Sequence, residues 1–159
     1  MTKDESLEIM RQRGKADALD LQSRAPSMTG TEIIAEENKV PAFDPTKDYS
    51  KWPVNAPVAD EEQVWLLLQP HNAAHFTGRP STLRAMWGLA HTTDPHKAKP
   101  WVASYGTSGL YKIDECCTYP YTDGTTHVFR NKYDNNDYPP LTLNVEDRWE
   151  DLGEVATYV

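Results

Sequence analysis

The sequence predicts an α+β protein in which a helical N-terminal segment is followed by two small, mainly antiparallel β modules. No aromatic residue precedes Phe43, although the chain holds five Trp, eight Tyr and three Phe. After Phe43, short apolar runs alternate with Pro, Asp and Asn, which is typical of short strands joined by tight turns. We therefore expect a helical attachment segment at residues 1–40 and three-stranded modules at 41–97 and 98–159.

The first helix is expected over residues 3–22. Thr2 and Glu5 have the spacing of a capping box, and apolar residues follow every three or four positions. This narrow stripe suits a helix that packs on a partner or on sister copies, although a loose solvated helix is the alternative. Residues 1–40 are then not needed to fold the modules, and a second short helix is expected at 31–37. The residues expected to attach the chain are Leu7, Met10, Ala18 and Leu21.

The first module contains one apolar run and one amphipathic run. VWLLLQ, residues 64–69, has the length of a buried strand. STLRAMWGLA, residues 81–90, begins with a Ser that can cap a helix and places Leu83, Met86 and Trp87 on one helical face. We therefore expect a strand and then a short helix in this module.

The second module carries the strongest hairpin signal of the chain. Asp123-Gly124 separates two β-prone runs, and this dipeptide favours a type I′ turn with positive φ at both positions. Cys116 and Cys117 are adjacent in the first of these runs. Because a disulfide between sequence neighbours is strained, we expect two reduced thiols in a strand.

The two aromatic parts of the chain repeat a weak pattern. Residues 64–80 begin Val-aromatic, continue through a polar turn to Pro80 and are followed by Trp87; residues 128–140 do the same before Trp149. Such a pattern resembles the small chitin-binding-type carbohydrate-binding modules that are attached to chitinases and occur in tandem in bacteriophage tail and baseplate proteins. The resemblance covers about residues 43–152 and rests in the second copy on Trp101, Tyr111, Asp123-Gly124, Val128-Phe129, Asp134-Asn135-Asn136, Pro139 and Trp149.

Two positions depart from that family. Asp114 stands where the family's Tyr-x-x-Gly-Asp motif has Gly, and Tyr133-Asp134 stands where the enzyme-attached modules often have paired tryptophans. A strong platform for crystalline chitin is therefore not expected. The first copy also lacks the glycine-centred hairpin, so it is expected to serve as a spacer or a protein-docking module.

The candidate binding residues lie in a cluster of rings and amides. Sugar rings stack on aromatic faces while neighbouring amides and carboxylates bind their hydroxyls. The alternative is that the Asn and Asp side chains cap a tight turn while the tyrosines pack. The expected carbohydrate-binding residues are Tyr133, Asp134, Asn135, Asn136 and Tyr138.

Few features of the sequence indicate catalysis, binding of a cofactor, metal or nucleic acid, or insertion into a membrane. There is no nucleophile elbow and no glycine-rich phosphate loop, so an enzyme is not expected. No cofactor or metal is expected either: His71 and His75 have helical ligand spacing, but Pro70 precedes them and no HExxH pattern accompanies them. The net charge of −8 argues against nucleic-acid binding, and no apolar run approaches the roughly 20 residues of a membrane span.

The resemblance implies a non-enzymatic structural protein of a phage virion, at the tail, baseplate or capsid surface. The N-terminus lacks the apolar core of a signal peptide, so synthesis in the host cytoplasm is expected. The expected partners are other virion proteins, host-surface glycans bound weakly and multivalently, and sister copies of the chain in a homo-oligomer. One rival is a purely structural decoration or adaptor protein whose modules contact protein; another is a carbohydrate-active enzyme.

Overall fold

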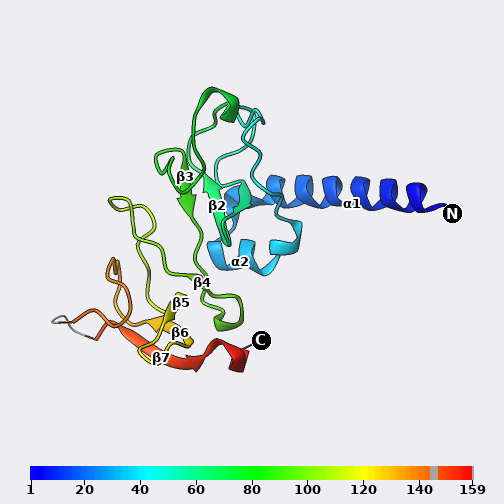
Figure 1. The fold of residues 1–159 in the computed structure, drawn as a ribbon. Coiled ribbons are helices and arrows are strands. Elements are labelled where there is room, and N and C mark those ends of the chain that lie inside the picture. Colours follow the sequence, from blue (N-terminus) through cyan, green and yellow to red (C-terminus); the bar gives the residue numbers. More distant parts are fainter. Residues whose placement is uncertain (144–146, 159) are drawn as a thin grey trace.

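The computed structural model describes residues 1–143 and 147–158, and it confirms the α+β class. Two helices precede a three-stranded antiparallel sheet and a four-stranded mixed sheet (Figure 1). The helices are α1 (Lys3–Arg24) and α2 (Gly30–Ala35); the first sheet holds β1 (Pro57–Asp60), β2 (Gln63–Leu67) and β3 (Trp87–Leu89). The second sheet holds β4 (Lys99–Pro100), β5 (Cys116–Pro120), β6 (Thr126–Asn131) and β7 (Trp149–Glu154). Short 3-10 turns lie at Ala25–Ser27, Glu37–Lys39, Ala73–His75, Pro95–Lys97 and Val155–Tyr158.

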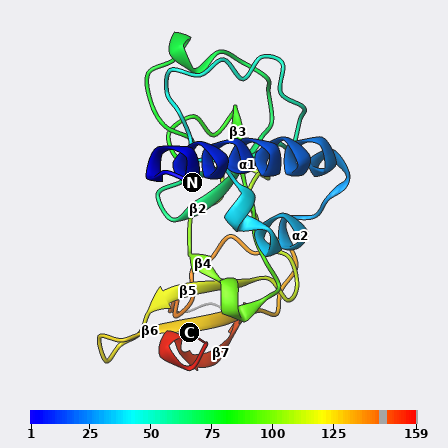
Figure 2. The same cartoon turned by 90° about the vertical axis from the view of Figure 1, so that its right-hand side faces the viewer.

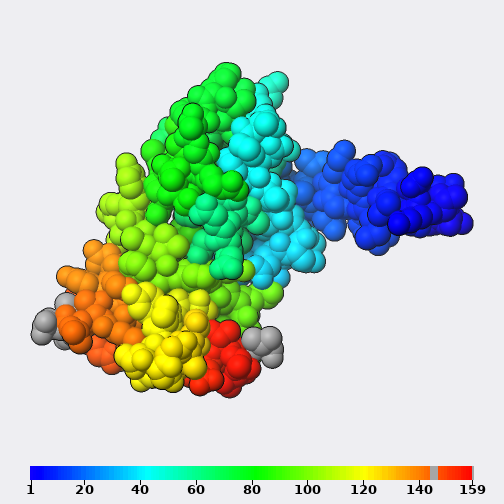
Figure 3. Space-filling view, in the orientation of Figure 1, coloured from blue at the N-terminus to red at the C-terminus, as the bar shows by residue number. Residues whose placement is uncertain are grey.

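Helix α1 begins at the predicted capping box and projects away from the body of the molecule (Figures 1 and 3). The Thr2 hydroxyl accepts the Glu5 N–H at 3.1 Å, and the Glu5 carboxylate accepts the Thr2 N–H at 3.0 Å. Leu7 and Met10 are 46% and 68% exposed, so this part of α1 has almost no packing within the chain. No helix among the described residues is both long enough and apolar enough to cross a bilayer.

The end of the N-terminal segment belongs to the first module. Ile33 and Ile34 of α2 are fully buried and pack with Val64 and Ala90. The expectation that residues 1–40 do not help to fold the modules is therefore wrong for their last part. That expectation relied on the lack of aromatic residues before Phe43. The two isoleucines show that aliphatic side chains alone can cover this face of the sheet.

Residues 81–90 do not form the expected helix. Residues 81–86 are turns, and Trp87–Leu89 is strand β3, with Trp87 opposite Leu67 of β2. At Gly88 an added Cβ would lie 3.1 Å from the Leu68 side chain, so this side chain packs directly on the glycine. Pairing with β2 outweighs the helical spacing, because tertiary contacts override weak local propensity.

The predicted hairpin is present, but its turn is not type I′. Strands β5 and β6 pair in antiparallel fashion, and residues 121–125 connect them. Gly124 has φ +88°, whereas Asp123 is not among the residues with positive φ. The Gly124 N–H donates to the Tyr121 carbonyl at 3.1 Å, and the Asp123 carboxylate accepts the Thr125 N–H at 3.0 Å.

The two modules share one strand arrangement, and their residues pair in the same register. Trp87 faces Leu67 in the first module as Trp149 faces Asn131 in the second. Two positions further along, Leu89 faces Trp65 and Asp151 faces Phe129. The repeat noticed in the sequence therefore recurs in the three-dimensional structure.

The segments that enter each module are also equivalent. The Phe43 N–H donates to the Ala59 carbonyl of β1, and the Trp101 N–H donates to the Thr118 carbonyl of β5. In the first module this contact is accompanied by an isolated parallel bridge, whereas in the second it extends into the two-residue strand β4. The second sheet therefore has four strands where three were expected.

A tyrosine and a tryptophan form the centre of each module. Tyr49 and Trp87 meet edge to face at 5.2 Å between ring centroids, and Tyr111 and Trp149 do so at 5.0 Å. Trp87 is fully buried and Trp149 is 5% exposed, so both are core residues. The modules pack one above the other (Figure 2), and His91 stacks on Tyr111 at 3.7 Å where they meet.

Candidate functional site

The amides of the predicted binding cluster have mainly structural roles. Asn136 is fully buried, its side chain donates to the Asn131 oxygen at 2.9 Å, and its own oxygen accepts the Tyr138 N–H at 3.0 Å. Asn135 has φ +55° and accepts a hydrogen bond from the Lys112 ammonium, while Asp134 is exposed. Asn136 therefore caps a turn, as the alternative interpretation of the cluster expected, and cannot reach a ligand.

The two tyrosines of the cluster are brought together around a cation. Tyr133 is 44% exposed and Tyr138 is 38% exposed. The Arg148 guanidinium lies 4.1 Å from the Tyr133 ring centroid and 4.6 Å from that of Tyr138. Contacts of this kind stabilise the arrangement through attraction between the cation and the ring faces. Each tyrosine thus has one face occupied by Arg148.

Tyr138 also lines a groove of about 600 Å³ on the second module. Tyr121 from the β5–β6 connection, Phe129 of β6 and Trp149 of β7 supply its other aromatic side chains. The Trp149 indole N–H donates to the Tyr138 carbonyl at 2.9 Å, which fixes the segment before β7 against the strand. Tyr133, Asp134 and Asn135 do not line this groove.

Charged side chains surround the aromatic part of the groove. They come mostly from β7 and the residues just before it; within β7 Trp149 is buried, whereas the next two residues, Glu150 and Asp151, are exposed. An aromatic wall beside carboxylates and cations suits a polar ligand with an apolar face, such as a sugar. The charged lining residues are Lys132, Asp147, Arg148, Glu150 and Asp151.

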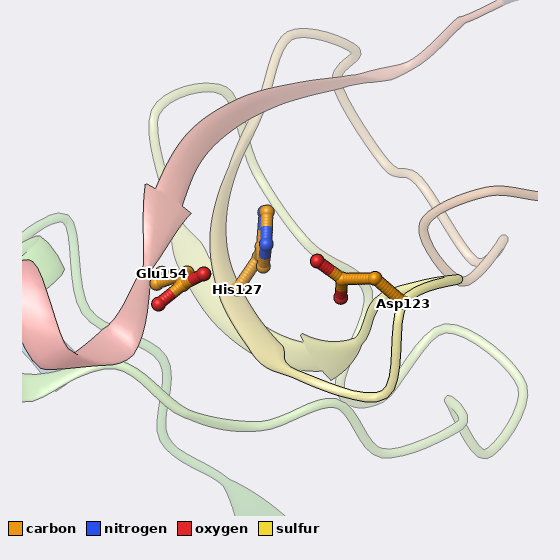
Figure 4. A group of neighbouring side chains, drawn as sticks. All are labelled: Asp123, His127 and Glu154. Atoms are coloured by element: carbon orange, nitrogen blue, oxygen red, sulfur yellow. The ribbon is translucent and has the colours of Figure 1, made fainter.

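Beside the groove, Asp123, His127 and Glu154 lie together (Figure 4). One ligand atom of each residue lies within 4.8 Å of the other two. The His127 Nδ1 is 2.8 Å and 3.0 Å from the two carboxylate oxygens of Asp151. Because Asp151 also lines the groove, this cluster and the groove share a wall.

The remaining groups considered in the sequence are the two cysteines and the His71/His75 pair. Cys116 and Cys117 are unbridged and buried in β5; burial raises the pKa of Cys116 to about 11 and raises that of Cys117 further. Such thiols stay protonated at neutral pH and are poor nucleophiles. His71 is buried and its Nδ1 lies 2.7 Å from the Gln69 carbonyl oxygen, whereas His75 is exposed.

The four predicted attachment residues differ in their exposure to solvent. Leu7 and Met10 are exposed on the projecting part of α1, and Ala18 is half-buried. Leu21 is fully buried within the chain, so it is not available to a partner. Leu19, 63% exposed, lies in the same part of the helix but outside the predicted stripe.

Sequence reasoning missed most residues of the groove. Tyr121, Arg148 and Asp151 are distant in sequence from residues 133–138, and they approach them only through the pairing of β5, β6 and β7. One signal was present: two charged residues stand directly on each side of Trp149 in the sequence, as expected for a core tryptophan in an otherwise exposed segment. No family model, curated protein or solved structure matches the chain.

Proposed function

We propose that the chain is a non-enzymatic structural protein of a phage virion, whose second module binds host-surface glycans weakly and whose copies act together. The observation that carries the proposal is the groove of about 600 Å³ in which Tyr121 and Tyr138 lie beside carboxylates. The sequence resemblance to small carbohydrate-binding modules supports the same ligand class. The virion setting rests on that resemblance.

The groove has the chemistry that a sugar needs. A pyranose presents axial C–H bonds to an aromatic ring and hydroxyls at its edge. Among the lining residues, Glu150 and Asp151 provide acceptors and Lys132 provides a donor. Because a single shallow groove of this kind binds weakly, useful attachment requires many copies that act by avidity.

Helix α1 suits the attachment of the chain to sister copies. An isolated helix of its length is marginal in water, and its exposed Leu7, Ile9 and Met10 provide apolar surface. Over residues 4–15 its charges form two blocks: Asp4, Glu5 and Glu8 precede Arg11, Arg13 and Lys15, while Lys3 stands before them and Asp17 and Asp20 after them. Two copies packed in antiparallel orientation would place opposite charges together, whereas a parallel pair would oppose like charges.

The structural-adaptor rival is favoured by one specific observation. Arg148 occupies one face of both Tyr133 and Tyr138, so these rings are already engaged within the chain. In that case the same groove would accept a loop of another virion protein in place of a sugar. The two functions differ in which partner is lost when the groove is altered.

Glycan-array binding by the oligomeric protein tests the proposal. Tyr138→Ala and Tyr121→Ala should each reduce bound signal at least tenfold while the circular dichroism spectrum is unchanged. Tyr105→Ala is the matched control, because Tyr105 is 58% exposed and does not line the groove. Undiminished glycan binding by the Tyr121→Ala/Tyr138→Ala double variant, together with reduced incorporation into particles, would establish the adaptor function instead.

A further inference from the structure

We infer that Asp123, His127 and Glu154 form a binding site for a divalent transition-metal ion of the Zn²⁺ type. The site comes from three different parts of the second module: the β5–β6 connection, strand β6 and the end of β7. In Figure 4 the side chains of Asp123 and Glu154 flank His127. These ligands have no recognisable spacing along the chain, so a metal site was not predicted here. This inference does not depend on what the groove binds.

The orientation of His127 provides the first independent support. Its Nδ1 is bonded to the Asp151 carboxylate at 2.8 Å, which favours the tautomer in which Nδ1–H donates and Nε2 carries a lone pair. Metal-binding histidines are commonly held in this way, by a carboxylate on the ring nitrogen that does not bind the metal. Tyr121 stacks on the ring at 4.0 Å and further restricts its rotation.

The other ring nitrogen of His127, Nε2, provides the second independent support for the metal site. His127 is 8% exposed, and its Nε2 is buried without a hydrogen-bond partner among the described residues. A buried polar atom without a partner costs free energy in the folded protein. A metal ion bound to Nε2 would satisfy it, and Asp123 and Glu154 are the carboxylates that lie near this ring.

The charge of the cluster also favours a cation. Asp123, Glu154 and Asp151 surround one imidazole, and no Lys or Arg within residues 1–143 and 147–158 forms an ion pair with any of these carboxylates. The Asp123 carboxylate accepts the Thr125 N–H and hydroxyl through the same oxygen, which leaves its other oxygen available to an ion. Asp123 and Glu154 are both exposed, so their side chains can move the short distance needed to close around an ion.

The ligand set selects among metals. Zn²⁺ binds histidine nitrogen and carboxylate oxygen at about 2.0–2.2 Å in four-coordinate sites, and three protein ligands leave a fourth position for water. Ca²⁺ and Mg²⁺ prefer six or more oxygen ligands and are poorly served by an imidazole. We therefore expect Zn²⁺ to bind, and Ca²⁺ and Mg²⁺ not to compete with it at similar concentrations.

Calorimetric titration of the full chain with ZnCl₂, after treatment with a chelator, tests the site. One ion per chain should bind, and Glu154→Gln and Asp123→Asn should each weaken binding at least tenfold. Asp151→Asn should weaken it by about 10–100-fold, since it acts only by orienting His127. The matched control is His75→Gln, which removes an exposed histidine outside the cluster and should leave Zn²⁺ affinity unchanged.

Nitrogen-15 NMR of the imidazoles identifies the ligand atom without relying on a variant that fails to fold. Zn²⁺ should shift Nε2 of His127 and leave Nδ1 as the protonated nitrogen. The inference is overturned if Zn²⁺ does not bind at 100 μM, if the Asp123→Asn/Glu154→Gln double variant binds as well as the unaltered chain, or if the His127 resonances do not respond. A loss of binding in His75→Gln equal to that in Glu154→Gln would show an adventitious ion only.

Discussion

His91 makes the stability of this protein depend on pH between 7 and 5. It lies where the two modules meet, stacks on Tyr111 at 3.7 Å and places Nε2 3.0 Å from the Gly109 carbonyl oxygen. Burial lowers its pKa from 6.5 to about 4, with a smaller contribution from the Arg84 charge, although the Gly109 hydrogen bond opposes the shift. In the unfolded chain the same imidazole takes up a proton near pH 6.5.

The sign and size of the effect follow from proton linkage. Between about pH 6.5 and pH 4 the unfolded state binds a proton at His91 that the folded state does not, so the free energy of unfolding falls as the pH falls. From pH 7 to pH 5 the loss should be about 2 kcal/mol. For a chain of this size that corresponds to a decrease in melting temperature of roughly 4–8 °C.

Thermal and urea unfolding at pH 7, 6 and 5 measure this dependence. His91→Gln should be less stable at pH 7 but should lose most of the pH dependence, whereas His75→Gln should keep it. Hydrogen bonds from Arg24 lower the pKa of Glu36 to about 2, so that carboxylate titrates below the window. An equal pH dependence in His91→Gln and in the unaltered chain would refute the assignment.

Two further predictions concern the core and the N-terminal segment. Trp149→Ala should cost about 3–5 kcal/mol in urea unfolding, because it removes a large core side chain that packs on Tyr111; a variant that stays as stable but loses glycan binding would show Trp149 to be a ligand platform. Deletion of residues 1–18 should leave the melting temperature nearly unchanged but abolish self-association in analytical ultracentrifugation. Deletion of residues 1–40 should also remove Ile33 and Ile34 from the face of Val64 and destabilise the first module by about 3–6 kcal/mol, so equal melting temperatures for the two deletions would contradict this role.

Local signals in the sequence predicted the fold class and several elements. The capping box at Thr2 and Glu5, the apolar run at 64–69 and Asp123-Gly124 each specify structure through neighbouring residues alone. The helix expected at 81–90 failed because Trp87 and Leu89 suit a short strand as well as a helical face, and only pairing with β2 decides between them. The register that creates such pairing is not visible in a short segment.

The candidate site was less predictable than the fold because its chemistry is assembled from distant residues. An Asn in a polar turn can face a ligand or bond to its own backbone, and the sequence of residues 133–138 is compatible with both. Asn136 is fully buried, so its side chain bonds to the backbone and does not face a ligand. The groove residues and the His127 cluster come from two strands, β6 and β7, and from the connections on either side of β6, so no local spacing identifies them.

The duplicated fold shows how two copies of one strand position came to differ. Val64 and Val128 are equivalent, so Gln63 at the start of β2 corresponds to His127 of β6. The Gln63 amide donates to the Pro100 carbonyl at 2.8 Å and so holds the second module against the first. Leu89 stands where Asp151 stands, and it cannot orient an imidazole. The first copy of the position therefore joins the modules, while the second provides a histidine with an orienting carboxylate and two further carboxylates beside it. The candidate groove and the His127 cluster therefore lie in the second module, whereas the equivalent position of the first module holds the two modules together.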